Sequence, residues 1–267
     1  MSRGAVLHRG PFRRLFGDFP EQLAETLDVP IVDDERDVDL GLILAWDGPP
    51  PRCRTFVPFD AIVAAQDKRE QFRRFHAAGV SIPESRLFDD FPTAQAFALA
   101  DHRRQWLLKW PLGSGAVGHV IIDRDTRVTR LWNPPFLIQE FIALDRPEVY
   151  RVFGCEGTLF GFNVRYFPPG TSSGPLVTLH RGAVYAPSGV PSPEVRDQAC
   201  LALSAFGLLS TFGCVDLILP PDGTVRVLEV NADGLHQFVY RVPELPSLAR
   251  ELAERVRAAF HLKLESA

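Results

Sequence analysis

The sequence lacks the marks of several protein classes. Its four cysteines (Cys53, Cys155, Cys200 and Cys214) are scattered without a CxxC pair. Such spacing is typical of free thiols in a reducing cytoplasm and argues against disulfides or a zinc site. No apolar run reaches membrane-spanning length, and the N-terminus lacks the apolar stretch of a signal peptide. We therefore expect a cytoplasmic protein that does not bind a membrane.

An excess of basic charge is also absent. The formal net charge is −4 and the isoelectric point is about 6.0, so the sequence does not predict a nucleic-acid partner. It contains no HExxH and no Walker loop, because no GK[ST] precedes a helix. With 267 residues the chain can form two or three compact units.

Helical and extended patterns are mixed along the chain, which indicates an α+β fold. The expected helices are 20–27, 67–79, 93–102, 192–206 and 245–261. The expected strands are 39–46, 105–112, 118–123, 136–142, 150–155 and 159–167. Three prolines at 49–51 end the first region, and a compact linker is expected after them. Residues 168–191, rich in Gly, Pro and Ser, indicate a mobile loop over a site.

Two acidic side chains are placed face to face by a predicted hairpin. Residues 214–219 and 224–231 alternate as strands do, and the Asp-Gly pair at 222–223 is typical of a two-residue turn. With that turn, Asp216 lies directly opposite Glu229. Their Cβ atoms are then about 5 Å apart, where like charges destabilise a sheet.

A cation between these carboxylates would remove that repulsion. Asn231 lies two residues beyond Glu229 and points to the same face. Together with Asp216 they form a cluster of oxygen ligands that suits Mg²⁺. The alternative is a solvated acidic rim with the turn shifted by one residue.

A second candidate is a strand followed by a glycine-rich loop. The strand carries Lys109, and the loop contains Gly113, Ser114, Gly115 and Gly118. Glycines let main-chain N–H groups crowd onto an anion, and a lysine adds a point charge. A flexible hairpin with a solvated lysine is the alternative.

Two further segments have polar residues in apolar strands. Gln139 and Glu140 interrupt residues 137–142, so this segment is either an edge strand or a hinge that contacts an adenine and its ribose. Arg151 and Arg165, on neighbouring strands, have the forked, permanently charged groups that bind phosphate. Solvated surface arginines are the simpler interpretation of either one alone.

The order of these segments resembles that of the ATP-grasp superfamily, in particular RimK-like ligases and ribosomal-peptide maturases. The similarity covers about residues 60–261. It implies two α+β subdomains that clasp ATP, with a shortened N-terminal α/β domain. The implied boundaries are 1–60 for that domain, 61–142 for the subdomain with the lid, and 143–267 for the subdomain with the metal site.

The resemblance also implies a role for each candidate residue. Lys68 and Lys109 would hold the phosphates of ATP, and Arg151 and Arg165 would act with Lys109 on the reacting groups. The implied lid residues are Gly113, Ser114, Gly115 and Gly118. The implied adenine hinge is Gln139, Glu140, Phe141 and Ile142. The implied ligands of two Mg²⁺ ions are Asp216, Glu229 and Asn231.

The implied reaction is ATP-dependent ligation through an acylphosphate. The substrates would be a small-molecule or peptide carboxylate and an amine or hydroxyl acceptor. The oligomeric state stays open, with a homodimer as one form that the resemblance suggests. Two alternatives share ATP binding: a regulatory or scaffold protein without ligation, and a kinase that phosphorylates a small hydroxyl substrate. Asp145 and Glu148 are both candidates for the ribose contact, because the acidic residue that RimK-like proteins carry two positions before Arg151 is here Val149.

Overall fold

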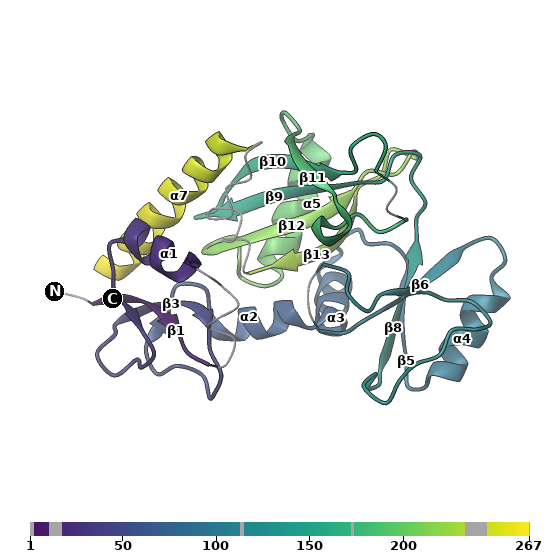
Figure 1. The fold of residues 1–267 in the computed structure, drawn as a ribbon, viewed down its shortest axis with the longest axis horizontal. Coiled ribbons are helices and arrows are strands. Elements are labelled where there is room, and N and C mark those ends of the chain that lie inside the picture. The colour runs from purple at the N-terminus through teal and green to yellow at the C-terminus, as the bar shows by residue number, and fades with distance from the viewer. Residues whose placement is uncertain (1–2, 11–17, 113–114, 172–173, 233–244, 267) are drawn as a thin grey trace.

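The computed structural model describes residues 3–10, 18–112, 115–171, 174–232 and 245–266. These residues form three β-sheets on which helices pack (Figure 1). Within these ranges, no helix is both long enough and apolar enough to cross a bilayer.

The N-terminal sheet is parallel, with the strand order β2-β1-β3-β4. Its strands are β1 (Gly4–His8), β2 (Ile31–Val32), β3 (Leu40–Ala45) and β4 (Arg54–Thr55). Helix α1 (Phe19–Leu27) contacts this sheet and also the C-terminal helix α7 (Pro246–Glu265). Leu23 and Leu27 of α1 are fully buried in the core, together with Phe260 of α7.

Two consecutive helices connect this sheet to the rest of the molecule. The sequence predicts a linker after the three prolines, but residues Phe59–Gln66 form helix α2. Its faces differ little in hydrophobicity, so no single apolar face marks it as a helix in the sequence. Helix α3 (Lys68–Ala78) confirms the expected helix 67–79: the Asp67 side chain accepts from the Arg69 N–H at its start, and Gly79 ends it in the left-handed conformation.

A small antiparallel sheet has the strand order β5-β8-β6-β7. Its elements are β5 (Ser85–Phe88), α4 (Phe91–Ala100), β6 (Gln105–Lys109), β7 (Val120–Ile121) and β8 (Phe136–Phe141). The strand expected at 118–123 is thus only two residues long. The core of this sheet contains Trp106, Leu108 and Ile138, which pack with Ala94 of α4.

A larger antiparallel sheet has the order β11-β10-β9-β12-β13. Its strands are β9 (Glu148–Cys155), β10 (Thr158–Tyr166), β11 (Val184–Pro187), β12 (Phe212–Ile218) and β13 (Arg226–Asn231). Helix α5 (Pro193–Ser204) packs on β9, β12 and β13, and α7 packs on β9 and β10. The segment 168–191, expected as a loop, contains the 3₁₀ helix η2 (Leu179–Arg181) and strand β11.

The predicted register of the acidic hairpin is correct, but the predicted turn is wrong. Asp216 pairs with Glu229. The strands end at Ile218 and resume at Arg226, so residues 219–225 form a longer loop than the expected two-residue turn. A shift of register between Asp216 and Leu217 restores the predicted pairing despite the longer loop. Leu217 pairs with Val227, and Leu228 is left as the extra residue of a β-bulge.

Candidate functional site

A cavity of about 860 Å³ lies where the three sheets meet. Residues of β6 and β8 from the small sheet line it, as do residues of β9, β12 and β13 from the large sheet. The end of β3 and one face of α2 complete the wall from the N-terminal region. In Figure 1 these three contributions follow one another along the long axis of the molecule.

Asp216 forms a buried ion pair with Arg151 on one side of the cavity. Both lie on adjacent strands at directly paired positions, so their side chains share a face of the sheet. Arg151 donates through Nε to Oδ1 at 2.6 Å and through Nη2 to Oδ2 at 2.9 Å. Arg165 of β10 adds a bond of 3.3 Å to Oδ2.

Neither guanidinium is saturated by these contacts. Nη1 of Arg151 and Nε of Arg165 are buried, and neither has a hydrogen-bond partner among the described residues. A buried donor without an acceptor is unfavourable. Both arginines line the cavity, and the phosphate-binding role expected for them stays a prediction.

Glu229 has a different basic partner. Its Oε2 lies 2.9 Å from Nζ of Lys68, the buried first residue of α3. Burial opposes ionisation of Glu229, but Lys68 and Lys109 outweigh it and hold the pKa of this carboxyl well below its usual range. Glu229 is therefore charged at neutral pH. Lys68 itself does not line the cavity, so in this structure it contacts the carboxylate behind the cavity wall.

Lys109 lies at the end of β6 and lines the cavity. Its Nζ donates to Oε1 of Gln139 at 3.1 Å and to the main-chain oxygen of Leu228 at 3.3 Å. Burial, with a smaller effect of Lys68, lowers the pKa of Lys109 to about 8, while Glu229 acts in the opposite direction. The ammonium group is thus fixed between the two sheets.

Asn231 completes the set of oxygen donors expected to hold Mg²⁺. It lines the cavity at the end of β13, and its Nδ2 is 3.5 Å from Oε1 of Glu229. Two carboxylates and an amide oxygen on neighbouring strands suit this ion, so the residues present fit it. The described residues include no group of three or more His, Cys, Asp and Glu that could hold a metal.

The predicted hinge lies where the chain crosses from the small to the large sheet. Gln139, Glu140, Phe141 and Ile142 all line the cavity. The main-chain N–H of Glu140 donates to Glu84, and the Gln139 side chain is held between Lys109 and Ser85. Beside the hinge lies an apolar cluster that extends the cavity wall, formed by Val149, Val177, Ala183 and Ile218 with Ile142, Leu144, Phe167 and Leu228.

The glycine-rich loop reaches the cavity in part. Gly113 and Ser114 lie outside the described residues. Gly115 lines the cavity at a φ of +66°, and a Cβ there would lie 3.1 Å from His180 of η2. Gly118, at a φ of +78°, packs on Trp110 and does not line the cavity. The loop therefore meets the segment that the sequence places over the site.

His119 lines the cavity although it is not among the expected site residues, and of the two ribose candidates only Glu148 lines it. His119 accepts a hydrogen bond from the Trp110 N–H through Nδ1, and burial with nearby Lys109 and Lys68 lowers the pKa of His119 to about 3, so the ring is neutral. Glu148 lines the cavity and accepts from the Tyr150 hydroxyl at 2.7 Å. Asp145, the other ribose candidate, is exposed and does not line the cavity.

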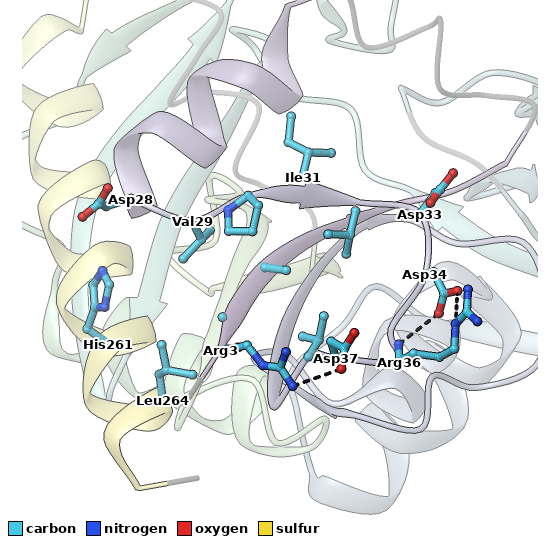
Figure 2. A pocket seen from close by; sticks show the side chains of 15 residues that line it. Arg3, Asp28, Val29, Ile31, Asp33, Asp34, Arg36, Asp37, His261 and Leu264 are labelled. Atoms are coloured by element: carbon cyan, nitrogen blue, oxygen red, sulfur yellow. Dashed lines mark hydrogen bonds and ion pairs between the residues drawn. The ribbon is translucent and has the colours of Figure 1, made fainter. Parts of the chain in front are cut away.

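A second hollow, of about 1020 Å³, lies in the N-terminal region beside the end of α7 (Figure 2). Its walls carry opposite charges in pairs: Arg36 lies 2.6 Å from Asp34, and Arg3 lies 3.1 Å from Asp37. It shares no lining residue with the first cavity and contains none of the expected site residues.

No family model matches the chain, and no curated protein matches it in sequence. Solved structures do. An ATP-complexed D-alanine–D-alanine ligase from Bacillus anthracis superposes with a TM-score of 0.67 at 16% identity, covering 97% of this chain and 99% of that one. A RiPP-associated ATP-grasp ligase from Chryseobacterium gregarium, in complex with ADP and a leader and core peptide, gives 0.65 at 12% identity and covers 98% and 97%.

A third structure is the macrocyclase MdnC from Microcystis aeruginosa MRC, bound with precursor peptide MdnA. It has a TM-score of 0.64 at 13% identity and covers 97% of this chain and 99% of that one. The chain therefore has the ATP-grasp fold, and the fold implied by the resemblance in its sequence is confirmed.

Proposed function

We propose that this protein is an ATP-dependent ligase that joins a carboxylic acid to an amine or a hydroxyl group. The observation that carries the proposal is one cavity lined by Lys109, Arg151, Asp216 and Glu229, with Lys68 paired to Glu229 behind its wall. The ATP-grasp fold supports it, as do neighbours described as ligases of small molecules and of peptides. The acid substrate is accordingly a small molecule or a peptide.

The proposed reaction has two steps. An oxygen of the carboxylate attacks the γ-phosphorus of ATP, the bond to the β,γ-bridging oxygen breaks, and ADP leaves. The amine or hydroxyl then attacks the acyl carbon and loses a proton, and phosphate leaves. The unsaturated N–H groups of Arg151 and Arg165 would stabilise charge on the transferred phosphoryl group, an electrostatic form of catalysis.

Asp216, Glu229 and Asn231 would hold Mg²⁺, and we propose that two ions bind there. Bound there, the metal neutralises phosphate charge during transfer. Because Asp216 is paired with Arg151 and Glu229 with Lys68, both basic side chains would turn from carboxylate to phosphate oxygens when ATP and the metal enter.

The rest of the cavity fits the nucleoside. Gln139, Glu140, Phe141 and Ile142 would contact the adenine, and the apolar cluster around Val149 would cover its faces. Of the two ribose candidates, Glu148 would hold the ribose, because it lines the cavity and Asp145 does not. The main chain of the glycine-rich loop would cover the phosphates and exclude water.

Trapping with hydroxylamine tests the proposal. The full chain is incubated with ATP, Mg²⁺, a mixture of carboxylic acids and hydroxylamine. A ligase forms a hydroxamate with ADP and phosphate in equal amounts. Lys109→Ala should abolish this product, whereas Arg103→Ala, an exposed arginine outside the cavity, should not. Phosphate left on the acceptor would identify a kinase, and nucleotide binding without turnover would identify a scaffold; either result contradicts ligation.

A further inference from the structure

One wall of the cavity is apolar and is not accounted for by the nucleotide. It consists of the end of β3 and one face of α2. The lining residues there are Ile43, Leu44, Ala45, Trp46, Phe59, Ile62, Val63 and Gln66. None of them is charged, in contrast to the neighbouring part of the cavity, where Arg151, Asp216 and Glu229 lie.

Helix α2 has an inverted distribution of side chains. The small residues Ala61, Ala64 and Ala65 are buried in the core. The larger Phe59, Ile62, Val63 and Gln66 follow at the spacing i, i+3, i+4, i+7 of a single helix face, and that face lines the cavity. Val63 is 51% exposed.

Such an arrangement is unusual in a protein core. Large apolar side chains are normally the buried ones, and a contiguous apolar surface left open to a cavity marks a binding site. Leu44 and Ile62 are partly buried against the main core, whereas among the described residues Phe59 and Val63 belong to none of the three hydrophobic cores. Their exposed surface is therefore available to a ligand.

Trp46 contributes its apolar ring to this wall, because its indole N–H is bonded elsewhere. Its indole N–H donates to the main-chain oxygen of Pro49 at 2.7 Å. The Arg9 guanidinium lies 5.3 Å from the ring centre and is itself 3.8 Å from Asp47. The two nearby charges thus partner each other, and neither lines the cavity.

The apolar wall adjoins the polar centre. Helix α2 packs against β13, the strand of Glu229 and Asn231, and Gln66 at its end precedes Asp67 and Lys68 by one and two residues. A carboxylate near Arg151 would therefore direct the group attached to it toward α2 and the end of β3. In Figure 1 this side lies opposite the small sheet, where the purine would bind.

We propose that the acid activated by this protein carries a large uncharged apolar group, a branched aliphatic chain or an aromatic ring, close to its carboxylate. Trp46, Phe59, Ile62 and Val63 bind that group. This inference rests on the proposed ligase function and names the class of its acid substrate.

Binding of two acids of nearly equal shape tests the inference. N-acetyl-leucine and N-acetyl-asparagine differ mainly in the polarity of the side chain. Their affinities for the full chain saturated with Mg-ADP are measured by saturation-transfer NMR at up to about 10 mM. N-acetyl-leucine should bind at least about tenfold more tightly, because the wall offers contact to methyl groups and almost no partner for an amide.

Variants test whether the preference for N-acetyl-leucine comes from the apolar wall. Val63→Asp adds a charge to the wall at an exposed position and should remove the preference for N-acetyl-leucine. Val190→Asp makes the same change at a residue that is 86% exposed and outside the cavity, and should keep it. Val63→Thr, of similar shape, should reduce the preference to an intermediate value and shows that the effect does not come from misfolding.

The outcomes separate this inference from the proposed function. Equal affinity for both acids, or no binding of either, while Mg-ADP still binds, overturns the inference alone. A preference that persists in Val63→Asp places the apolar contact elsewhere and also overturns it. A chain that binds N-acetyl-leucine selectively but neither ATP nor ADP supports the apolar site and overturns the ligase function.

Discussion

The two sheets that face each other across the cavity hold their charges in different ways. In the large sheet, Asp216 is fixed by Arg151 and Arg165 from neighbouring strands of the same sheet. In the small sheet, Lys109 donates to Gln139 of its own sheet and across the cavity to Leu228. The large sheet therefore carries a charge cluster that forms with the fold. The position of the Lys109 ammonium in the small sheet depends on how closely the two sheets approach each other, because one of its two hydrogen bonds crosses to the large sheet.

This difference predicts that changes in the large sheet affect stability and changes in the small sheet affect nucleotide binding. In Asp216→Ala, Arg151 stays buried without its carboxylate partner. The free energy of unfolding should fall by about 3–5 kcal/mol, the usual effect of breaking a buried ion pair. Urea unfolding followed by circular dichroism measures it.

The matched control is Asp37→Ala. Its pair with Arg3 has side chains that are 81% and 63% exposed, so the loss should stay below about 1 kcal/mol. Equal losses in the two variants would contradict the distinction between the buried and the surface pair.

In the small sheet, Lys109→Ala should weaken Mg-ATP binding roughly 10- to 100-fold, because it removes a charge-assisted hydrogen bond of about 1.5–3 kcal/mol. The free energy of unfolding should fall by less than in Asp216→Ala, since Lys109 donates to two neutral oxygens and has no carboxylate within hydrogen-bonding distance among the described residues. Isothermal titration calorimetry gives the affinity. Unchanged affinity would remove Lys109 from the site.

The same lysine predicts a pH dependence. Because burial lowers the pKa of Lys109 to about 8, its charged form is lost as the pH rises above 8 in the free protein. Phosphate requires the charged form, so affinity should fall above pH 8 by up to about tenfold per unit, with a proton taken up on binding. The unfolded chain keeps this proton up to about pH 10.5, so the contribution of Lys109 to stability increases between about pH 8 and 10.5.

Calorimetry at pH 7 and 9 in buffers of different ionisation enthalpy detects this proton. Lys109→Arg stays charged throughout and should bind Mg-ATP with nearly the same affinity at both pH values. A wild-type affinity that does not change over this range would show that Lys109 does not contact phosphate.

The smallest effect is expected at Gly115. Its positive φ makes alanine unfavourable by about 1 kcal/mol, and the new Cβ would also press on His180. Gly189→Ala is the control, with a φ of +72° but no atom within 4 Å of the added Cβ. Gly115→Ala should lose at least as much stability as Gly189→Ala in thermal unfolding, and only Gly115→Ala should bind Mg-ATP a few-fold less tightly. Equal affinities would place the loop away from the nucleotide.

The sequence predicts the site best where segments that are adjacent in the chain determine its geometry. Asp216 and Glu229 face each other as expected, because strand alternation and a nearby reversal are local properties. The partners Arg151 and Lys68 could not be predicted, since they depend on which strand lies beside β12 and on how α3 packs against β13. Residues 1–60, 61–142 and 143–267 remain a predicted division of the chain into domains.

Helix α2 shows why pattern-based prediction missed a whole element. It is apolar on several sides, because one face packs in the core and another lines the cavity. A helix with one buried face has a single recognisable apolar stripe, whereas α2 is apolar on two faces. Strand β1 was also missed, because its five residues are buried without alternation and follow directly on the N-terminus.

The bulge at Leu228 separates the hairpin loop from the reactive end of the hairpin. Asp216 and Glu229 are in register on one side of it, and the loop 219–225 with its exposed tip at Asp222 and Gly223 is on the other. Segments added at that tip need not alter how the carboxylates meet. The tip is therefore a suitable place to splice in an affinity tag or a fluorescent reporter while the chemistry of the protein is studied.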